Sequence, residues 1–147
     1  NLPPSPEVII ESLGALKLGI LARAGHPLAG QSHVKMTDLA LFPLAIESGR
    51  LPPSFPPYSG GLSCENSHIL RDIVLGSDAL WFSSPEIVEC DIAAGSLVEI
   101  DVVDLAFRHV DVGIVKLTRR DSSQAMTAVS EFVRNILSGS VAEHAGP

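Results

Sequence analysis

Two stretches of the sequence carry residues that could do nucleophilic or acid–base chemistry. Cys64 and His68 are four residues apart, a spacing that places two side chains on one face of a helix. A cysteine at the start of a helix has a lowered thiol pKa, so the pair could serve as a cysteine–histidine nucleophile. His26 stands in "ARAGHPLAG", where an apolar run ends in Arg23, and Pro27 keeps His26 out of helical geometry.

Each of these residues also has a simpler structural interpretation, which we favour. A catalytic histidine needs a nucleophile or a carboxylate within hydrogen-bond reach, and His26 has none nearby in the sequence. We therefore predict a turn residue whose ring packs on the rim of the domain. No family-specific signature surrounds Cys64, which suits a small residue at a strand end. A hydrolase that uses Cys64 and His68 remains a third alternative.

Other catalytic and metal-binding motifs are missing from the sequence. It has no G-x-S-x-G elbow and no phosphate-binding glycine loop, and its two cysteines, Cys64 and Cys90, lack the spacing of a zinc site. We expect buried free thiols in a reducing cytosol, with no cofactor, no metal and no enzymatic activity. The expected location is cytoplasmic.

Composition narrows the class of protein further. The chain has 147 residues, enough for one domain with a core, and its net charge is −7, from 10 basic and 17 acidic residues. This balance argues against a DNA-binding face on the chain itself. No apolar run is long enough to span a membrane. The first residues, "NLPPSPEV", contain no initiator methionine, so we expect a fragment of a longer protein.

Hydrophobic periodicity predicts strands that alternate with helices. The predicted elements are two strand-like runs within residues 8–25, strands at 43–46, 62–64, 78–84, 97–103 and 109–117, helices starting at Asn66 or Ser67 and at Ser84–Pro85, and a last helix starting at Asp121 or Ser123. Such alternation predicts βαβ units and a mostly parallel sheet that is covered on both faces.

The ends of three predicted strands carry small polar residues. They are Ile46–Gly49, Ser63–Ser67 and Phe82–Ser84. In open parallel sheets, ligands bind beyond the carboxyl ends of strands, and the start of a helix offers free backbone N–H donors. These ends therefore fit a pocket for a small polar ligand, although ordinary helix capping would account for Asn66 and Ser84 equally well.

The order of several motifs resembles one known family. In sequence they are "RAGHPLA", "TDLALFPLAI", "ENSHILRDIVLGSDALWFSSPEI", "AAGSLVEI" and "VDVGIVKLTRRDSSQAMTAVSEFV". This set resembles the effector-binding, or substrate-binding, domain of LysR-type transcriptional regulators over residues 8–137. "LGSDAL" is similar to the branch named after galactose-binding-protein regulators.

The resemblance implies an α/β fold of the periplasmic-binding-protein-like type 2. One lobe would be near-complete, and the chain would add the crossover strands and the C-terminal helix of the other lobe. The expected bounds are a disordered or linker segment at 1–7, an effector-binding domain fragment at 8–137 and a tail at 138–147. Within the fragment, the second subdomain is expected at about 28–104, the crossover strands at about 16–22 and 110–117, and the C-terminal helix at about 122–137.

The resemblance also implies a function, that of a ligand-sensing regulatory domain. A small metabolite effector, anionic or sugar-related, would bind in a cleft between the lobes. The effector contacts carried over from the family are Glu47, Ser48, Cys64, Glu65, Asn66 and Ser67. The expected partners are the effector and further copies of the chain, in a dimer or tetramer. DNA would be bound only through a winged helix-turn-helix domain that this sequence lacks, and no membrane is expected.

The sequence departs from the family pattern in one stretch, and one alternative stays open. "LPPSFPPYSGG" stands where the family commonly has a helix. The alternative to a regulator is one lobe of a solute-binding protein, or of a related small-molecule-binding enzyme. The sequence identifies neither the effector nor the target promoter, and it does not distinguish an activator from a repressor.

Overall fold

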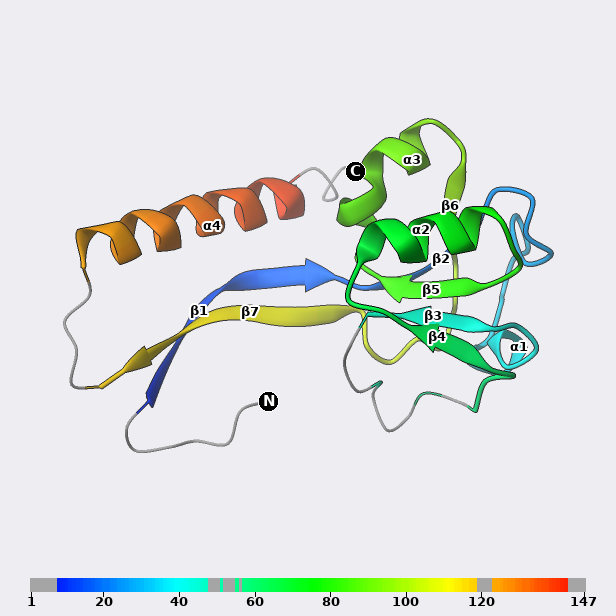
Figure 1. Ribbon diagram of the computed structural model, residues 1–147, viewed down its shortest axis with the longest axis horizontal. Helices are drawn as coiled ribbons and strands as arrows, with labels where there is room; N and C mark the ends of the chain where they lie inside the picture. The colour runs from blue at the N-terminus through cyan, green and yellow to red at the C-terminus, as the bar shows by residue number, and fades with distance from the viewer. Residues whose placement is uncertain (1–7, 48–50, 52–54, 56, 119–122, 143–147) are drawn as a thin grey trace. The chain divides into compact units, whose positions relative to one another are not determined.

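The computed structural model describes residues 8–47, 51, 55, 57–118 and 123–142, and the side chains as far as Leu137. The chain forms two compact units. One consists of Lys17–Arg108, and the other combines Asn1–Leu16 with His109–Pro147. Each unit has its own sheet (Figure 1).

The unit Lys17–Arg108 is built on a five-stranded sheet in the order β4-β3-β5-β2-β6. The strands are β2 (Gly19–Arg23), β3 (Leu44–Ile46), β4 (Gly61–Ser63), β5 (Leu80–Ser83) and β6 (Leu97–Ile100). β3 pairs parallel with β4 and β5, whereas β2 runs antiparallel to both β5 and β6. Four of the five strands thus point the same way, as predicted, and β2 makes the sheet mixed.

Apolar cores lie on both faces of this sheet, because the side chains of β2 alternate. Leu21 packs with Trp81 and Leu97 under α2 (Ser67–Leu75), the 3-10 turn η1 (Pro85–Val88) and α3 (Glu89–Ala93). Ile20 and Ala22 face the opposite core, which α1 (Met36–Leu39) and the chain segments on either side of it help to cover. The prediction that both faces are covered is confirmed.

An ion pair joins the two helices on the first face. Arg71 of α2 holds the Asp91 carboxylate of α3 through Nε and NH2, at 2.7 Å and 2.5 Å. This bidentate contact lowers the pKa of Asp91 and raises that of Arg71. Gly95 follows α3 with φ +71°, the left-handed conformation that suits glycine at a helix end, as the sequence predicts.

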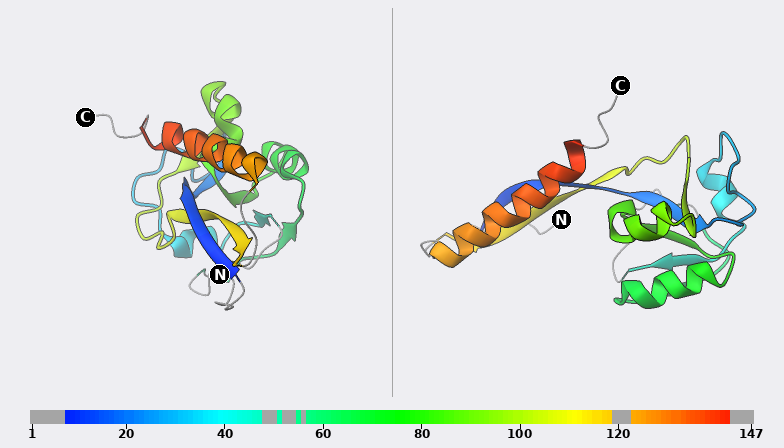
Figure 2. Two further views of the ribbon diagram at one scale, coloured as in Figure 1. Left: turned by 90° about the vertical axis from the view of Figure 1, so that its left-hand side faces the viewer. Right: turned by 90° about the horizontal axis from the view of Figure 1, so that it is seen from above.

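The other unit is a two-stranded sheet with one helix. Its strands are β1 (Val8–Lys17) and β7 (His109–Leu117), whose arrows run in opposite directions in Figure 1. The helix α4 (Gln124–Ala142) runs alongside them in the right-hand view of Figure 2. The Glu11 carboxylate of β1 binds Lys116 of β7 and Arg134 of α4, so one side chain links all three elements.

Two elements differ from the bounds expected for them. In the region expected as a crossover strand at about 16–22, β2 lies inside the five-stranded sheet, and the strand beside β7 is β1. Both runs alternate similarly, so periodicity alone could not tell them apart. The last helix is described as far as Ala142, beyond the expected end at about Leu137. The segment predicted at 1–7 and the end of the predicted tail lie outside the described residues.

Candidate functional site

Three strand ends meet at one edge of the five-stranded sheet. In the parallel register, Ile46 lies between Ser63 of β4 and Phe82 of β5, so the residues that follow each strand are neighbours. The backbone N–H of Cys64 donates to the Ile46 carbonyl at 3.1 Å. The structure therefore brings Glu47 and the start of α2 to the same edge, as the sequence analysis expects.

Glu47 is linked to the third strand end by a side-chain contact. The Ser83 hydroxyl donates to Glu47 Oε1 at 3.4 Å, and Ser83 is buried while Glu47 is exposed. The buried neighbour Ser84 bonds the Glu86 carboxylate instead of capping the following turn. Ser83 is absent from the predicted contacts, although the run "FSSP" at a strand end is the signal that places it there.

The start of α2 is already closed by its own cap. Asn66 Oδ1 accepts from the backbone N–H groups of His68, at 3.0 Å, and of Ile69, at 3.3 Å. Cys64 Sγ accepts from the N–H of Asn66 at 3.4 Å. Two of the free donors of a helix start are thus satisfied within the chain, which weakens the case for an anion at this position.

The remaining predicted contacts differ in exposure. Glu65 and Asn66 are exposed, and Cys64 and Ser67 are half-buried. Ser48 lies outside the described residues. Neither of the two described cavities, of about 230 Å³ and about 340 Å³, is lined by Glu47 or by the predicted residues from Cys64 to Ser67. The site is therefore an edge of polar groups that lies open within this unit.

The two residues considered as a nucleophilic pair make no described contact with each other. No contact described for Cys64 joins it to His68, although both residues are described. Among the described residues, no group of histidine, cysteine and carboxylate side chains could hold a metal ion. None of the described helices is long and apolar enough to cross a membrane.

His26 is a buried structural residue, 3% exposed. Its Nδ1 accepts from the backbone N–H of Leu28 at 3.1 Å, and its Nε2 lies 3.2 Å from the Asp78 carbonyl. A neutral ring with its proton on Nε2 satisfies both contacts. Burial lowers the pKa of His26, against the opposing effect of the Asp78 carbonyl. The ring also packs on Phe42, with ring centroids 4.5 Å apart, so the prediction of a packed turn residue is confirmed.

One protein-family model matches nearly the whole chain. The model described as "LysR substrate binding domain" matches residues 1–138. The chain belongs to this family. The domain has the periplasmic-binding-protein-like type 2 fold, as the motif order implies. The alternative of a solute-binding-protein lobe is not favoured by this match. The predicted galactose-binding-regulator branch stays a prediction.

Solved structures of LysR regulators share the fold. The regulatory domain of MetR from N. meningitidis superposes with a TM-score of 0.75 at 12% identity, over 92% of this chain and 66% of that chain. The CcmR regulatory domain of Synechocystis PCC6803, solved with 2-PG, gives 0.70 at 14% identity, over 92% of this chain and 70% of that one. HinK of Pseudomonas aeruginosa gives 0.62 at 20% identity, over 91% of this chain.

The chain is shorter than these regulators. It spans 49% of the length of HinK and 66% of the MetR regulatory domain. No curated protein sequence matched it.

Proposed function

We propose that the chain senses a small metabolite through the carboxyl edge of β3, β4 and β5. The single observation that carries this proposal is the parallel register that sets Glu47 beside Cys64 and Ser83. The proposed contacts are Glu47, Ser48, Cys64, Glu65, Asn66 and Ser67, with Ser83 added. Small polar groups at such an edge are the usual means by which open parallel sheets hold ligands.

The charges at this edge favour a hydroxyl-bearing effector over an anion. Glu47 and Glu65 bring two carboxylates, and Asn66 already occupies two donors of α2. A carboxylate that ends a strand accepts hydrogen bonds from sugar hydroxyls but repels an anionic ligand. Of the two predicted classes of effector, we therefore favour the sugar-related metabolite. CcmR, by contrast, was solved with 2-PG.

The proposed output is regulation of transcription without catalysis. Effector binding would favour one conformation of the regulator over another, and a DNA-binding domain outside this sequence would transmit that preference to a promoter. Such a protein acts in the bacterial cytoplasm, which is the location we propose. Enzymatic activity is not part of the proposal, and Cys64 and His68 make no described contact with each other.

Self-association is the second part of the proposal. The unit that contains β1, β7 and α4 exposes large apolar side chains on all three elements, and Phe132 of α4 is 66% exposed. The others are Ile9, Ile10, Val110, Val115, Leu117, Met126, Val129 and Ile136. Exposed apolar surface of this kind marks interaction sites. We propose that copies of the chain associate through it as a dimer or tetramer.

A thermal-shift screen tests the effector proposal. The probes are neutral sugars and polyols (D-glucose, D-galactose, D-ribose, glycerol) and the corresponding sugar acids. A ligand of the folded state raises the melting temperature by linkage. We expect a neutral sugar or polyol to bind, and Glu47→Gln to weaken it about tenfold, as the loss of a hydrogen bond to a charged group does.

The matched control is Glu89→Gln, which removes an exposed carboxylate of α3 that is not among the proposed contacts. It should leave the binding unchanged. If sugar acids alone bind, and Glu47→Gln strengthens them, the proposed class of effector is wrong.

A further inference from the structure

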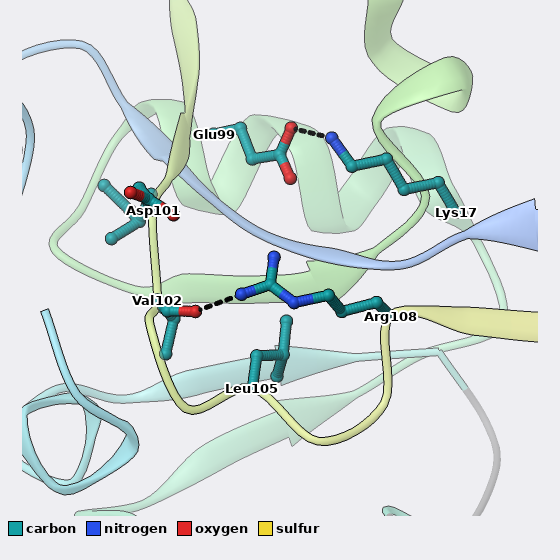
Figure 3. A pocket seen from close by; sticks show the side chains of 7 residues that line it. Lys17, Glu99, Asp101, Val102, Leu105 and Arg108 are labelled. Atoms are coloured by element: carbon teal, nitrogen blue, oxygen red, sulfur yellow. Dashed lines mark hydrogen bonds and ion pairs between the residues drawn. The ribbon is translucent and has the colours of Figure 1, made fainter. Parts of the chain in front are cut away.

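A cavity of about 230 Å³ lies within the unit Lys17–Arg108, beside the end of β6 (Figure 3). Its lining comes from the first and last residues of that unit, from the end of β6 and from the segment that follows β6. The lining residues are Lys17, Glu99, Ile100, Asp101, Val102, Leu105 and Arg108. None of these seven residues is among the proposed effector contacts.

Two of the four charged side chains in this cavity neutralise each other. Lys17 Nζ lies 2.7 Å from Glu99 Oε2. The ion pair holds both groups at one side of the lining, where Figure 3 shows them pointing toward each other. A charged ligand must therefore find its partners among the other two groups.

Arg108 and Asp101 keep their charges available. Arg108 NH2 donates to the Val102 carbonyl at 2.7 Å, which uses one of the five N–H donors of the guanidinium. No described residue gives Arg108 a carboxylate partner, and the Asp101 carboxylate makes no described hydrogen bond or ion pair. The cavity thus offers one cationic and one anionic group, both exposed.

The rest of the lining is apolar and well packed. Val102 is 1% exposed and Leu105 is 8% exposed, so both contribute fixed surfaces rather than mobile side chains. Pockets for small molecules combine such apolar walls with a few polar groups that set the orientation of the ligand. The small volume restricts the ligand to a few heavy atoms beyond its charged groups.

We propose that this cavity binds a small aliphatic α-amino acid as its zwitterion. The carboxylate would pair with Arg108, the ammonium group with Asp101, and the side chain would pack on Val102 and Leu105. A guanidinium is suited to bidentate carboxylate binding, and an isolated carboxylate is suited to an ammonium group. This site lies at the same edge of the sheet as the Glu47 site, because Gly19 of β2 pairs with Ser83 and β2 also pairs with β6. The two sites share no residue, and each is tested with its own ligands and variants.

The cavity lies where the chain enters and leaves its unit. Lys17 and Arg108 are the two terminal residues of their unit, and the backbone N–H of Leu18 donates to the Arg108 carbonyl at 2.7 Å. A ligand held by Arg108 would therefore brace the place where the chain enters and leaves the unit. Such a ligand acts as a second input to the same domain.

Isothermal titration calorimetry tests the proposal on the unaltered chain. The probes are glycine, L-alanine, L-valine and L-leucine, together with isocaproate, which is leucine without its amino group, and isoamylamine, which is leucine without its carboxylate. We expect at least one amino acid to bind. Each truncated analogue of leucine should bind at least tenfold more weakly than leucine, because each lacks one charged hydrogen-bond partner.

Substitutions then locate the site. Arg108→Gln and Asp101→Asn should each weaken amino-acid binding about tenfold, while Glu47→Gln at the strand ends leaves it unchanged. Amide shifts in NMR spectra should fall within residues 99–108. The comparison of leucine with its two analogues uses the unaltered chain, so it tests amino-acid binding even where a variant unfolds.

Three results would overturn the proposal. They are no binding by any of the four amino acids, equal binding of leucine and both analogues, and binding that neither Arg108→Gln nor Asp101→Asn weakens. None of them bears on the Glu47 site, which is probed with sugars.

Discussion

Single residues in this domain divide into those that hold the fold and those that face a ligand. His26 and Trp81 belong to the first group, because both are buried. Glu47 belongs to the second group, since it is exposed at a sheet edge and touches only the Ser83 hydroxyl among the described contacts. Asn66 serves the fold through its cap, whatever it also contributes to binding.

The buried His26 makes stability depend on pH. Burial lowers its pKa below the ordinary value of 6.5, so the unfolded chain binds the proton more tightly than the folded one. Its contribution to stability is complete above about pH 6.5 and is lost as the pH falls toward the lowered pKa. Urea midpoints should therefore drop between pH 7.5 and pH 5.5, and drop less in His26→Gln. His68→Gln, at an exposed histidine, should keep the full dependence; an equal drop in both variants would contradict this role.

The Asn66 cap should be measurable as helix stability. Asn66→Ala removes the acceptor for two backbone N–H groups and should cost about 1 kcal/mol in the free energy of unfolding. Asn66→Asp keeps an oxygen acceptor and should recover most of the loss. Urea denaturation followed by circular dichroism measures both. An alanine variant as stable as the original chain would show that the cap contributes nothing.

The predictions for single residues succeed where the residue type alone favours a position, as at helix ends. They fail where the position depends on contacts with residues far away in the sequence. Asn66, Pro85 and Gly95 could be placed on helix ends from their types alone. The Ser83–Glu47 contact joins residues 36 positions apart, and the Asp78 carbonyl reaches His26 across 52 positions. Hydrophobic periodicity gives no information about contacts between residues so far apart in the sequence.

At the scale of elements, the order and type of strands and helices follow from hydrophobic pattern, but strand partners do not. The runs at 8–17 and 19–23 both alternate, yet only the second enters the five-stranded sheet. Gly19, the first residue of β2, leaves room for the Glu99 side chain, since a Cβ atom there would lie 2.6 Å from Glu99 Oε1. Because this oxygen ends a flexible side chain, a larger residue at position 19 would displace Glu99 rather than exclude β2 from the sheet.

The parallel pairing of β3 and β4 depends on Gly61. A Cβ atom at this position would lie 2.3 Å from the backbone carbonyl of Leu44, which cannot move aside as a side chain would. Gly61→Ala should therefore destabilise the fold by about 1–3 kcal/mol, as overpacking does. Gly76→Ala is the control, because its nearest contact would be an ordinary 3.4 Å. Urea denaturation of both variants checks the difference, and equal stabilities would rule out the close approach.

The Glu11 carboxylate should hold α4 on its strands. Lys116 and Arg134 lower its pKa, so its stabilising effect is present above the ordinary value of 4.5 and is lost as the pH falls through the lowered pKa. Glu11→Gln should therefore speed amide hydrogen exchange in α4 at neutral pH. Glu131→Gln, an exposed position on the same helix, should not. Unchanged exchange in Glu11→Gln would show that apolar packing alone holds the helix.

For the whole molecule, the two units differ in how completely they are packed. The unit Lys17–Arg108 has a core on each face of its sheet, whereas the unit with β1, β7 and α4 exposes apolar side chains on every element. The sequence indicates this contrast through the broad apolar stripe of the last helix. It could not show which of those side chains stay uncovered, because covering depends on packing across the unit.

Self-association should depend on this exposed apolar surface. Phe132→Asp puts a charge at its most exposed large side chain and should shift sedimentation-velocity profiles toward the monomer. Asn135→Asp adds the same charge at an exposed polar position of α4 and should leave the profile unchanged. A chain that is monomeric at every concentration before any substitution would end the proposal of self-association through this surface.

The central claim is that the carboxyl edge of β3, β4 and β5 holds the effector. Two-dimensional amide NMR, with a neutral sugar or polyol found in the thermal-shift screen, tests this most directly. The account predicts that the largest shifts fall at Ile46–Glu47, Cys64–Ser67 and Ser83, and that Glu47→Gln needs about tenfold more ligand to produce them. Shifts confined to residues far from these strand ends, with Glu47→Gln binding as tightly as the original chain, would contradict it.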